Sequence, residues 1–425
     1  AAKEIPTSGD NILEKHCITA IEIRNAILYS KLESIDQHSG MKVFQGLLPD
    51  VQNPGAFTRV IIRPENQDFW DRCIKLSLQN HPVCGVGNPG IGKTTTVLYL
   101  LQQLVMHQQQ RGVYTIRGSG GLQDIFYEFI PSVDNTQVNN LTVKVYGVHA
   151  SKKHLAIPSM TKESAFFVLD PGNFEGTCAD FNDYDARFIM AASNDSRHWG
   201  GNEFVKNRQP SWPVARLQFG KISKEGVLVY GSLWTARQVT LAKPYLWQLQ
   251  GLDDSQVLYR FRIVGGSLRD MLSFDENEFK QNVENALNVS AETAKELAEG
   301  KYNFPFKSDS PSSVLIGIGP GDPSSSLHRT LLKITLKSDY IEERVANKYL
   351  KMSWFAVLNE SNAGNCGSLF ESYVRLKFSQ QPVTFAGADA RESLRETPNT
   401  KNRREKKNYQ HIQGEIELGS RRIVV

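Results

Sequence analysis

The sequence lacks long apolar runs, paired cysteines and a strong excess of either charge. No stretch approaches the roughly 18 apolar residues that a membrane-spanning helix needs, so we expect no membrane partner. The five cysteines contain no CxxC pair, which argues against a disulfide scaffold and against a zinc site. Lys and Arg number 49 and Asp and Glu 45, a net charge of +4 that neither requires nor excludes a nucleic-acid partner.

The chain also lacks an initial Met and an amino-terminal signal segment, since it opens AAKEIPTSGD. We expect a fragment or a processed form, so this absence says little about where the protein acts. Its 425 residues are 40% hydrophobic and 22% charged, which is typical of a globular protein of about two to three domains. That composition excludes a disordered protein and a coiled-coil rod.

The strongest feature is GNPGIGKT, from Gly87 to Thr94, which fits the phosphate-binding pattern G-x-x-x-x-G-K-[ST]. It lies between a short apolar strand and a helix expected at TTTVLYLLQQL. We expect its glycines to permit backbone conformations closed to other residues, so that successive N–H groups and the helix N-terminus face phosphate oxygens. Lys93 would face the β- and γ-phosphates, and Thr94 would bind Mg²⁺. The predicted ligands are ATP and Mg²⁺, and the predicted binding residues are Gly87, Asn88, Pro89, Gly90, Ile91, Gly92, Lys93, Thr94 and Thr95.

A second Mg²⁺ ligand is expected where the apolar run SAFFVLD ends, at Asp170. The alternative is that Asp170 only begins the turn D-P-G. The next apolar run, RFIMAAS, is followed by Asn194, which would either read the γ-phosphate or form a turn. Many related ATPases carry a catalytic Glu directly after the aspartate, whereas this chain has Pro171, so no catalytic base is assigned and turnover stays open.

Several short β-type runs alternate with polar or helical stretches, a pattern that predicts a parallel α/β sheet. They are GVYTIRG, LTVKVYG, SAFFVLD, RFIMAAS and VARLQFG. A helix is expected at NQDFWDRCIKLSLQN, and the pattern is helical again from Ala242 to about Gly300. Within that stretch IVGGSLR places Gly-Gly before Arg269, which would either reach the phosphates from a helical lid or be an ordinary surface arginine.

The order GNPGIGKT, FFVLD, IVGGSLR and SWFAVLN…GSLFE resembles the Crinkler and retrotransposon-hot-spot family, over roughly Gln67 to Ser379. These are P-loop ATPases of eukaryotic microbes joined to a restriction-type nuclease domain, and Crinklers are secreted effectors of which many act in the host nucleus. The resemblance implies an AAA/STAND-like ATPase in which Asp170 is the Walker aspartate, Asn194 the polar sensor and Arg269 the lid arginine. It also implies secretion and a host protein partner, and it leaves a homo-oligomer open.

The carboxy-terminal part departs from that family pattern. By resemblance, GSLFE is the first nuclease helix and Glu371 its acidic residue, but the 54 residues after it hold no strand-Asp-strand-Glu-x-Lys arrangement. Nuclease activity is therefore doubtful for this chain. The basic stretch KNRREKK, Lys401 to Lys407, has two functional interpretations: contact with the phosphate backbone of DNA or RNA, and a nuclear import signal. The alternative is a solvated, disordered end.

Together these features predict an α/β fold: a P-loop NTPase core of AAA/STAND type with a parallel sheet and a helical lid, followed by a smaller C-terminal α/β segment and a basic tail. The expected parts are 1–60 (role unknown), 61–235 (NTPase core), 236–300 (lid), 301–385 (start of a nuclease) and 386–425 (tail). The expected function is ATP hydrolysis, or switching on ATP binding, that controls a nucleic-acid-directed C-terminal segment. The alternatives are a nucleotide-gated binding switch without significant turnover and a nucleic-acid-binding or nuclease effector with a regulatory ATPase. The location is the host nucleus by resemblance, and otherwise nuclear or cytoplasmic.

Overall fold

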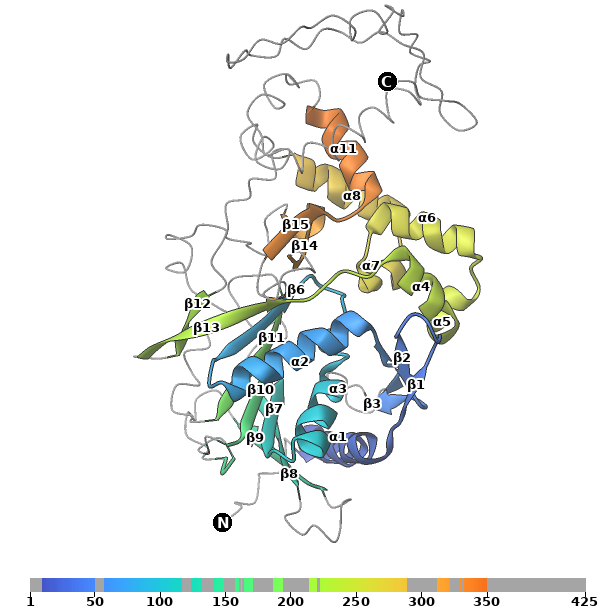
Figure 1. Ribbon diagram of the computed structural model, residues 1–425. Coiled ribbons are helices and arrows are strands. Elements are labelled where there is room, and N and C mark those ends of the chain that lie inside the picture. The colour runs from blue at the N-terminus through green and yellow to red at the C-terminus, as the bar shows by residue number, and fades with distance from the viewer. Residues whose placement is uncertain are drawn as a thin grey trace, which may run out of the picture. The chain divides into compact units, whose positions relative to one another are not determined.

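The computed structural model describes residues 10–49, 57–116, 124–131, 141–148, 157–159, 162, 164–170, 186–193, 214–219, 222–288, 312–321, 329 and 332–349 (Figure 1). The chain divides into two compact units, of which the first holds Ala1–Ser290 and Tyr302–Ile341. The second holds Ala291–Lys301 and Glu342–Val425. The large sheet and the residues of the candidate site belong to the first unit. The predicted domain boundaries stay predictions.

An eight-stranded mixed sheet forms the centre of the first unit (Figure 1). Its strand order is β12-β13-β6-β11-β10-β7-β8-β9. The five strands from β13 to β7 run parallel, and β12, β8 and β9 extend the two edges in antiparallel pairs. The strands are β6 (Val83–Gly87), β7 (Gly112–Ile116), β8 (Asp124–Pro131), β9 (Leu141–Val148), β10 (Phe166–Asp170), β11 (Arg187–Ser193), β12 (Val214–Phe219) and β13 (Ile222–Tyr230). The expected α/β fold is confirmed, and the five β-type runs and the apolar run before the loop all form strands of this sheet. The sheet is mixed rather than wholly parallel, because β9 and β12, two of the predicted strands, pair antiparallel with their neighbours. Strands β8 and β13 were not predicted.

Burial on both faces explains the unbroken apolar sequence of the central strands. All five residues of β10 are buried. Phe166 and Val168 join the cluster that the helices cover, while Phe167 and Leu169, which point to the opposite face, are also at most 1% exposed. A strand that is buried on both sides has no position for an alternating polar residue, and this is typical of parallel sheets.

Helices α1 (Asp10–Tyr29), α2 (Pro64–Leu78) and α3 (Val97–Gln102) pack on one face of the sheet in a common apolar cluster (Figure 1). The chain continues from α3 into a π-helix, η1 (Gln103–His107). The helix predicted over NQDFWDRCIKLSLQN is confirmed as α2. It begins two residues earlier because proline, with its fixed φ and missing N–H, suits the first helical position. The long helix α1 was not predicted.

The helical segment expected from Ala242 begins slightly earlier. It comprises α4 (Ala236–Ala242), the 3-10 turn η5 (Lys243–Tyr245), α5 (Trp247–Gln250), α6 (Asp254–Val264), α7 (Leu268–Leu272) and α8 (Glu276–Leu287). A capping box starts α6, where the Gln256 N–H donates to Asp253 Oδ1 at 2.8 Å. Buried Val257 and Met271 of this segment share a core with Met41 from the amino-terminal part. Residues before the sheet therefore help to hold the helices in place.

The remaining elements are short. A three-stranded sheet joins β1 (Leu32–Ser34), β2 (Lys42–Phe44) and β5 (Ile61–Ile62), and β3 (Leu48–Pro49) pairs with β4 (Phe57–Thr58). Towards the carboxyl end lie α10 (Ser312–Leu315), the antiparallel pair β14 (Ile316–Pro320) and β15 (Leu332–Leu336), and α11 (Asp339–Tyr349). In the described part of the chain, no helix combines the length and the apolar character needed to cross a membrane.

Candidate functional site: a phosphate-binding loop

The loop that follows β6 and the carboxylate that closes β10 lie at one edge of the sheet. Strands β6 and β10 are both parallel to β11, which lies between them. In the register of β11 and β6, Ser193 at the end of β11 is paired with Gly87. Ligands of open α/β sheets bind outside the carboxyl ends of such strands. Asn194 follows β11 directly, but it lies outside the described residues, as does Glu371.

The three glycines of the loop do not share one backbone conformation. Gly90 and Gly92 have φ of +77° and +91°, in the left-handed region where a side chain is disfavoured. Gly87 does not share this conformation, so the expectation that all three glycines serve the same purpose is wrong. A Cβ at Gly87 would lie 2.3 Å from Cδ1 of Ile91, so a side chain there would require the end of the Ile91 side chain to move.

The helix after the loop begins later than the sequence indicated. Regular α3 starts at Val97, whereas residues 94–96 form a turn in which the Thr96 N–H donates to Gly92 O at 2.9 Å. The Thr96 hydroxyl also bonds Gly92 O, at 2.7 Å, and accepts a hydrogen bond from Trp70 Nε1 at 2.9 Å. A threonine that satisfies nearby backbone groups in this way competes with regular helix geometry.

Three residues of the predicted site, Lys93, Thr94 and Asp170, lie close to one another beside this loop. The Thr94 hydroxyl donates to Asp170 Oδ2 at 2.6 Å, and Asp170 is 3% exposed. The Lys93 ammonium donates to Gly87 O at 2.8 Å and to Asn88 O at 3.0 Å. Burial lowers the pKa of Lys93 to about 7, with Asp170 opposing this shift and the positive charge of Arg269 adding to it.

The same pair of oxygens fits Mg²⁺. A hydroxyl and a carboxylate are hard oxygen ligands, and Mg²⁺ commonly takes one or two protein oxygens together with phosphates and water. Thr94 and Asp170 supply such a pair with their oxygens 2.6 Å apart. The described residues contain no group of three or more His, Cys, Asp and Glu side chains placed to hold a metal ion. Magnesium at this loop would take its other ligands from phosphates and water.

The VGGSLR segment lies directly against the outer side of the loop. The Leu268 N–H donates to Gly90 O at 3.1 Å, and the Ser267 hydroxyl donates to Pro89 O at 3.2 Å. A Cβ on Gly90 would lie 2.7 Å from the Cβ of Arg269, so this glycine also permits the close approach of α7. Arg269 lies in the first turn of α7, is exposed, and is close to Gly90 of the loop.

Arg63 is a buried cation beside the loop that sequence reasoning missed. Its guanidinium donates to Leu233 O at 2.8 Å, to Ser232 O at 2.9 Å and to Ile91 O in the loop at 3.4 Å. It also lies 4.5 Å from the ring centroid of Trp234. Burial lowers the pKa of Arg63 to about 10, which still leaves it charged at neutral pH. A single arginine before a proline carries no sequence signal of this role.

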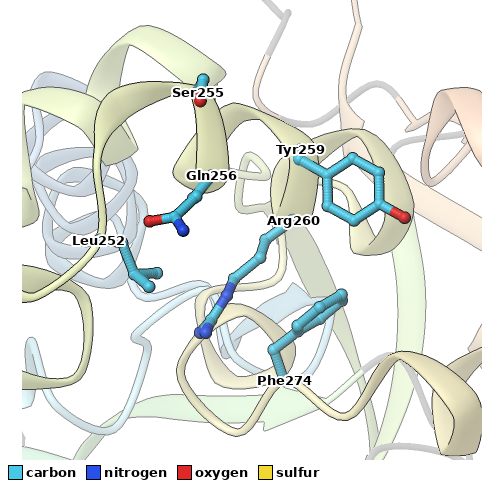
Figure 2. A pocket seen from close by; sticks show the side chains of 6 residues that line it. All are labelled: Leu252, Ser255, Gln256, Tyr259, Arg260 and Phe274. Atoms are coloured by element: carbon cyan, nitrogen blue, oxygen red, sulfur yellow. The ribbon is translucent and has the colours of Figure 1, made fainter.

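A separate hollow of about 470 Å³ lies among the helices after β13 (Figure 2). Its lining consists of Leu252, Ser255, Gln256, Tyr259, Arg260 and Phe274. The Arg260 guanidinium lies 5.1 Å from the ring centroid of Phe274 and donates to Met271 O at 3.3 Å. None of the residues predicted for nucleotide binding lines this hollow.

Comparison of the chain with protein-family models, with curated proteins and with solved structures finds no match in any of the three. The resemblance to the Crinkler and retrotransposon-hot-spot family thus rests on the sequence motifs alone.

Proposed function

We propose that this protein binds Mg·ATP through Gly87–Thr95 and hydrolyses it. The observation that carries the proposal is the 2.6 Å hydrogen bond between Thr94 and Asp170, which lie 76 residues apart in the sequence. A P-loop mechanism needs a hydroxyl and a strand-end carboxylate at one Mg²⁺ site, beside the lysine of the loop. The alternative, that Asp170 only begins a turn, does not predict a hydrogen bond with the Thr94 hydroxyl.

Each residue has a distinct part in the proposed mechanism. The loop N–H groups and Lys93 would bind the phosphates, and Lys93 would offset the charge that develops during transfer. Thr94 and Asp170 would hold Mg²⁺, which when bound neutralises and orients the β- and γ-phosphates. Arg269 would reach the phosphates from α7. Asn194 stays a proposed γ-phosphate sensor, because it follows β11 at this edge of the sheet.

A nucleotide-gated switch without significant turnover is the second candidate. Pro171 favours it, because this residue follows Asp170 where many related ATPases carry the base that activates water. The resemblance to Crinklers adds that the nucleotide would control a C-terminal segment directed at nucleic acid in a host nucleus. Contact with DNA or RNA through Lys401–Lys407, a host protein partner, a homo-oligomer and residual nuclease activity at Glu371 are proposals from the sequence alone.

The test is to measure ATP binding and phosphate release on the same samples of the full chain, with Mg²⁺ and with EDTA. Binding together with Mg²⁺-dependent release would support an ATPase. Tight binding with negligible release would favour the switch. If the chain neither binds nor hydrolyses ATP at millimolar concentration, the proposal is wrong in both forms.

The affinity for Mg·ATP is expected to fall as the pH rises through 7. The pKa of Lys93 is lowered to about 7 by burial, and a bound phosphate would raise it, so that binding takes up a proton above pH 7. The dissociation constant should therefore increase about tenfold between pH 6 and pH 8. Fluorescence titration in excess Mg²⁺ would measure it.

Lys93→Arg is the matched control for this pH dependence, because a guanidinium stays charged over the whole range. Its affinity is expected to be lower than that of the wild type but flat with pH. A wild-type affinity that does not change between pH 6 and pH 8 would contradict the titration of Lys93. The same slope in Lys93→Arg would assign the effect to another group.

A further inference from the structure

The side chain of Asn88, the second residue of the loop, is bound to a strand far away in the sequence. Its Nδ2 donates to Ile318 O at 2.9 Å, and the Ile318 N–H donates to Asn88 Oδ1 at 3.4 Å. Asn88 is 0% exposed and Ile318 is 2% exposed. The two residues are 230 positions apart. This amide therefore ties the loop to β14.

The register of β14 and β15 explains why Ile318 has both backbone groups available. The Lys337 N–H donates to Leu315 O at 2.9 Å, which makes these two residues a hydrogen-bonded pair. Successive residue pairs in an antiparallel ladder alternate between hydrogen-bonded and non-hydrogen-bonded pairs. Ile318 and Ile334 form the third pair after Leu315 and Lys337, so they are a non-hydrogen-bonded pair. Its N–H and C=O point away from β15, and Asn88 binds them as a neighbouring strand would.

The end of β15 in turn contacts the turn between α6 and α7, which packs against the loop. The Ser338 hydroxyl donates to Ile263 O at 2.8 Å, and the chain at Lys337 passes so close to Gly265 that a Cβ there would lie 1.9 Å from Lys337 O. Two residues after Gly265, Ser267 contacts Pro89 of the loop. The loop, the β14–β15 pair and the turn between α6 and α7 thus form a closed ring of contacts.

We propose that Asn88 is a positioning residue that couples nucleotide binding in the loop to the β14–β15 pair. The inference rests on the proposed function. Nucleotide that orders the loop would stabilise the pairing of Asn88 with Ile318, and by thermodynamic reciprocity the pairing strengthens nucleotide binding by the same factor. The physical basis is preorganisation, because a loop already held by β14 loses less conformational freedom when phosphate binds.

Hydrogen–deuterium exchange on the full chain tests this coupling, with and without Mg²⁺ and a non-hydrolysable ATP analogue. In the wild type the analogue is expected to slow exchange in β14 and β15 by about threefold or more. Asn88→Ala should remove that slowing and weaken analogue binding about tenfold, since both partner groups on Ile318 lose their hydrogen bonds. Asn285→Ala, at an exposed position of α8, is the control and should behave as the wild type.

The outcomes separate this proposal from the proposed function. If the analogue binds and protects the loop but leaves β14 and β15 unchanged in the wild type, the coupling is overturned while the ATP site stands. If the wild type binds no analogue, both fall. If Asn88→Ala does not fold, Asn88→Asp replaces it, because the carboxylate keeps the size and the acceptor but cannot donate to Ile318 O. Persistence of the nucleotide-dependent slowing in Asn88→Asp, or in a folded Asn88→Ala, would also overturn the coupling.

Discussion

Lys93→Ala is expected to reduce Mg²⁺-dependent phosphate release by at least about a hundredfold, the usual effect of removing a charge that stabilises a transition state in a partly buried site. The reason is geometric as well as electrostatic. The Lys93 ammonium is held by the loop itself, within hydrogen-bond distance of Gly87 O and Asn88 O. Alanine leaves the loop backbone intact but removes the cation. Phosphate release under saturating ATP, with nucleotide binding in the same samples, measures the effect.

Lys75→Ala is the matched control, because Lys75 is an exposed lysine on α2. It should retain wild-type turnover. Unfolding of Lys93→Ala should be followed in parallel, since burial lowers the pKa of Lys93 and its charged form is thus disfavoured in the folded chain. That penalty applies in full below pH 7 and is relieved as the pH rises, so the alanine variant is not expected to be less stable by more than about 1 kcal/mol. Wild-type turnover in a folded Lys93→Ala would place the activity elsewhere.

Two of the predicted strands, β10 and β11, could be predicted from their apolar sequence alone. FFVLD and RFIMAAS consist of apolar residues almost throughout, and a run without alternation indicates a strand buried on both faces. Strand β8 was missed because its sequence DIFYEFIP contains Glu128 in a buried position. Its carboxylate accepts hydrogen bonds from the Tyr146 hydroxyl at 2.7 Å and from the Ser159 N–H at 3.0 Å. Only the folded chain brings these partners together.

The candidate site likewise contains residues that could be predicted from the sequence and contacts that could not. Lys93 and Thr94 could be predicted because the loop motif is one continuous segment whose spacing fixes its chemistry. Asp170 could be predicted because it closes an apolar strand. The partners of Asn88 and Arg63 could not, since Asn88 binds a strand 230 residues later and Arg63 binds carbonyls up to 170 residues away. No local pattern marks these long-range contacts. The glycines before Arg269 indicated a tight turn without revealing what it approaches.

Gly265→Ala is expected to lower the free energy of unfolding by about 3 kcal/mol or more, through two independent penalties. Gly265 has φ of +72° and ψ of −155°, a conformation that residues with a side chain rarely adopt. A Cβ would also lie 1.9 Å from Lys337 O and 2.7 Å from Lys337 C, which are backbone atoms that cannot rotate away. Relief would require the β14–β15 end to separate from the turn between α6 and α7. Urea denaturation followed by circular dichroism measures the loss.

Two other glycines separate these penalties. Gly46 has φ of +74°, but a Cβ there would meet no atom within 4 Å, so Gly46→Ala carries the backbone cost alone, about 1–2 kcal/mol. Gly251 has φ of −79° and equally open surroundings, and Gly251→Ala should change stability by less than about 1 kcal/mol. Because α7 contacts the loop through Leu268 N–H and Gly90 O, Gly265→Ala should also weaken Mg·ATP binding, whereas the two controls should not. Equal losses of stability in Gly265→Ala and Gly46→Ala would show that the close approach to Lys337 is not what requires glycine.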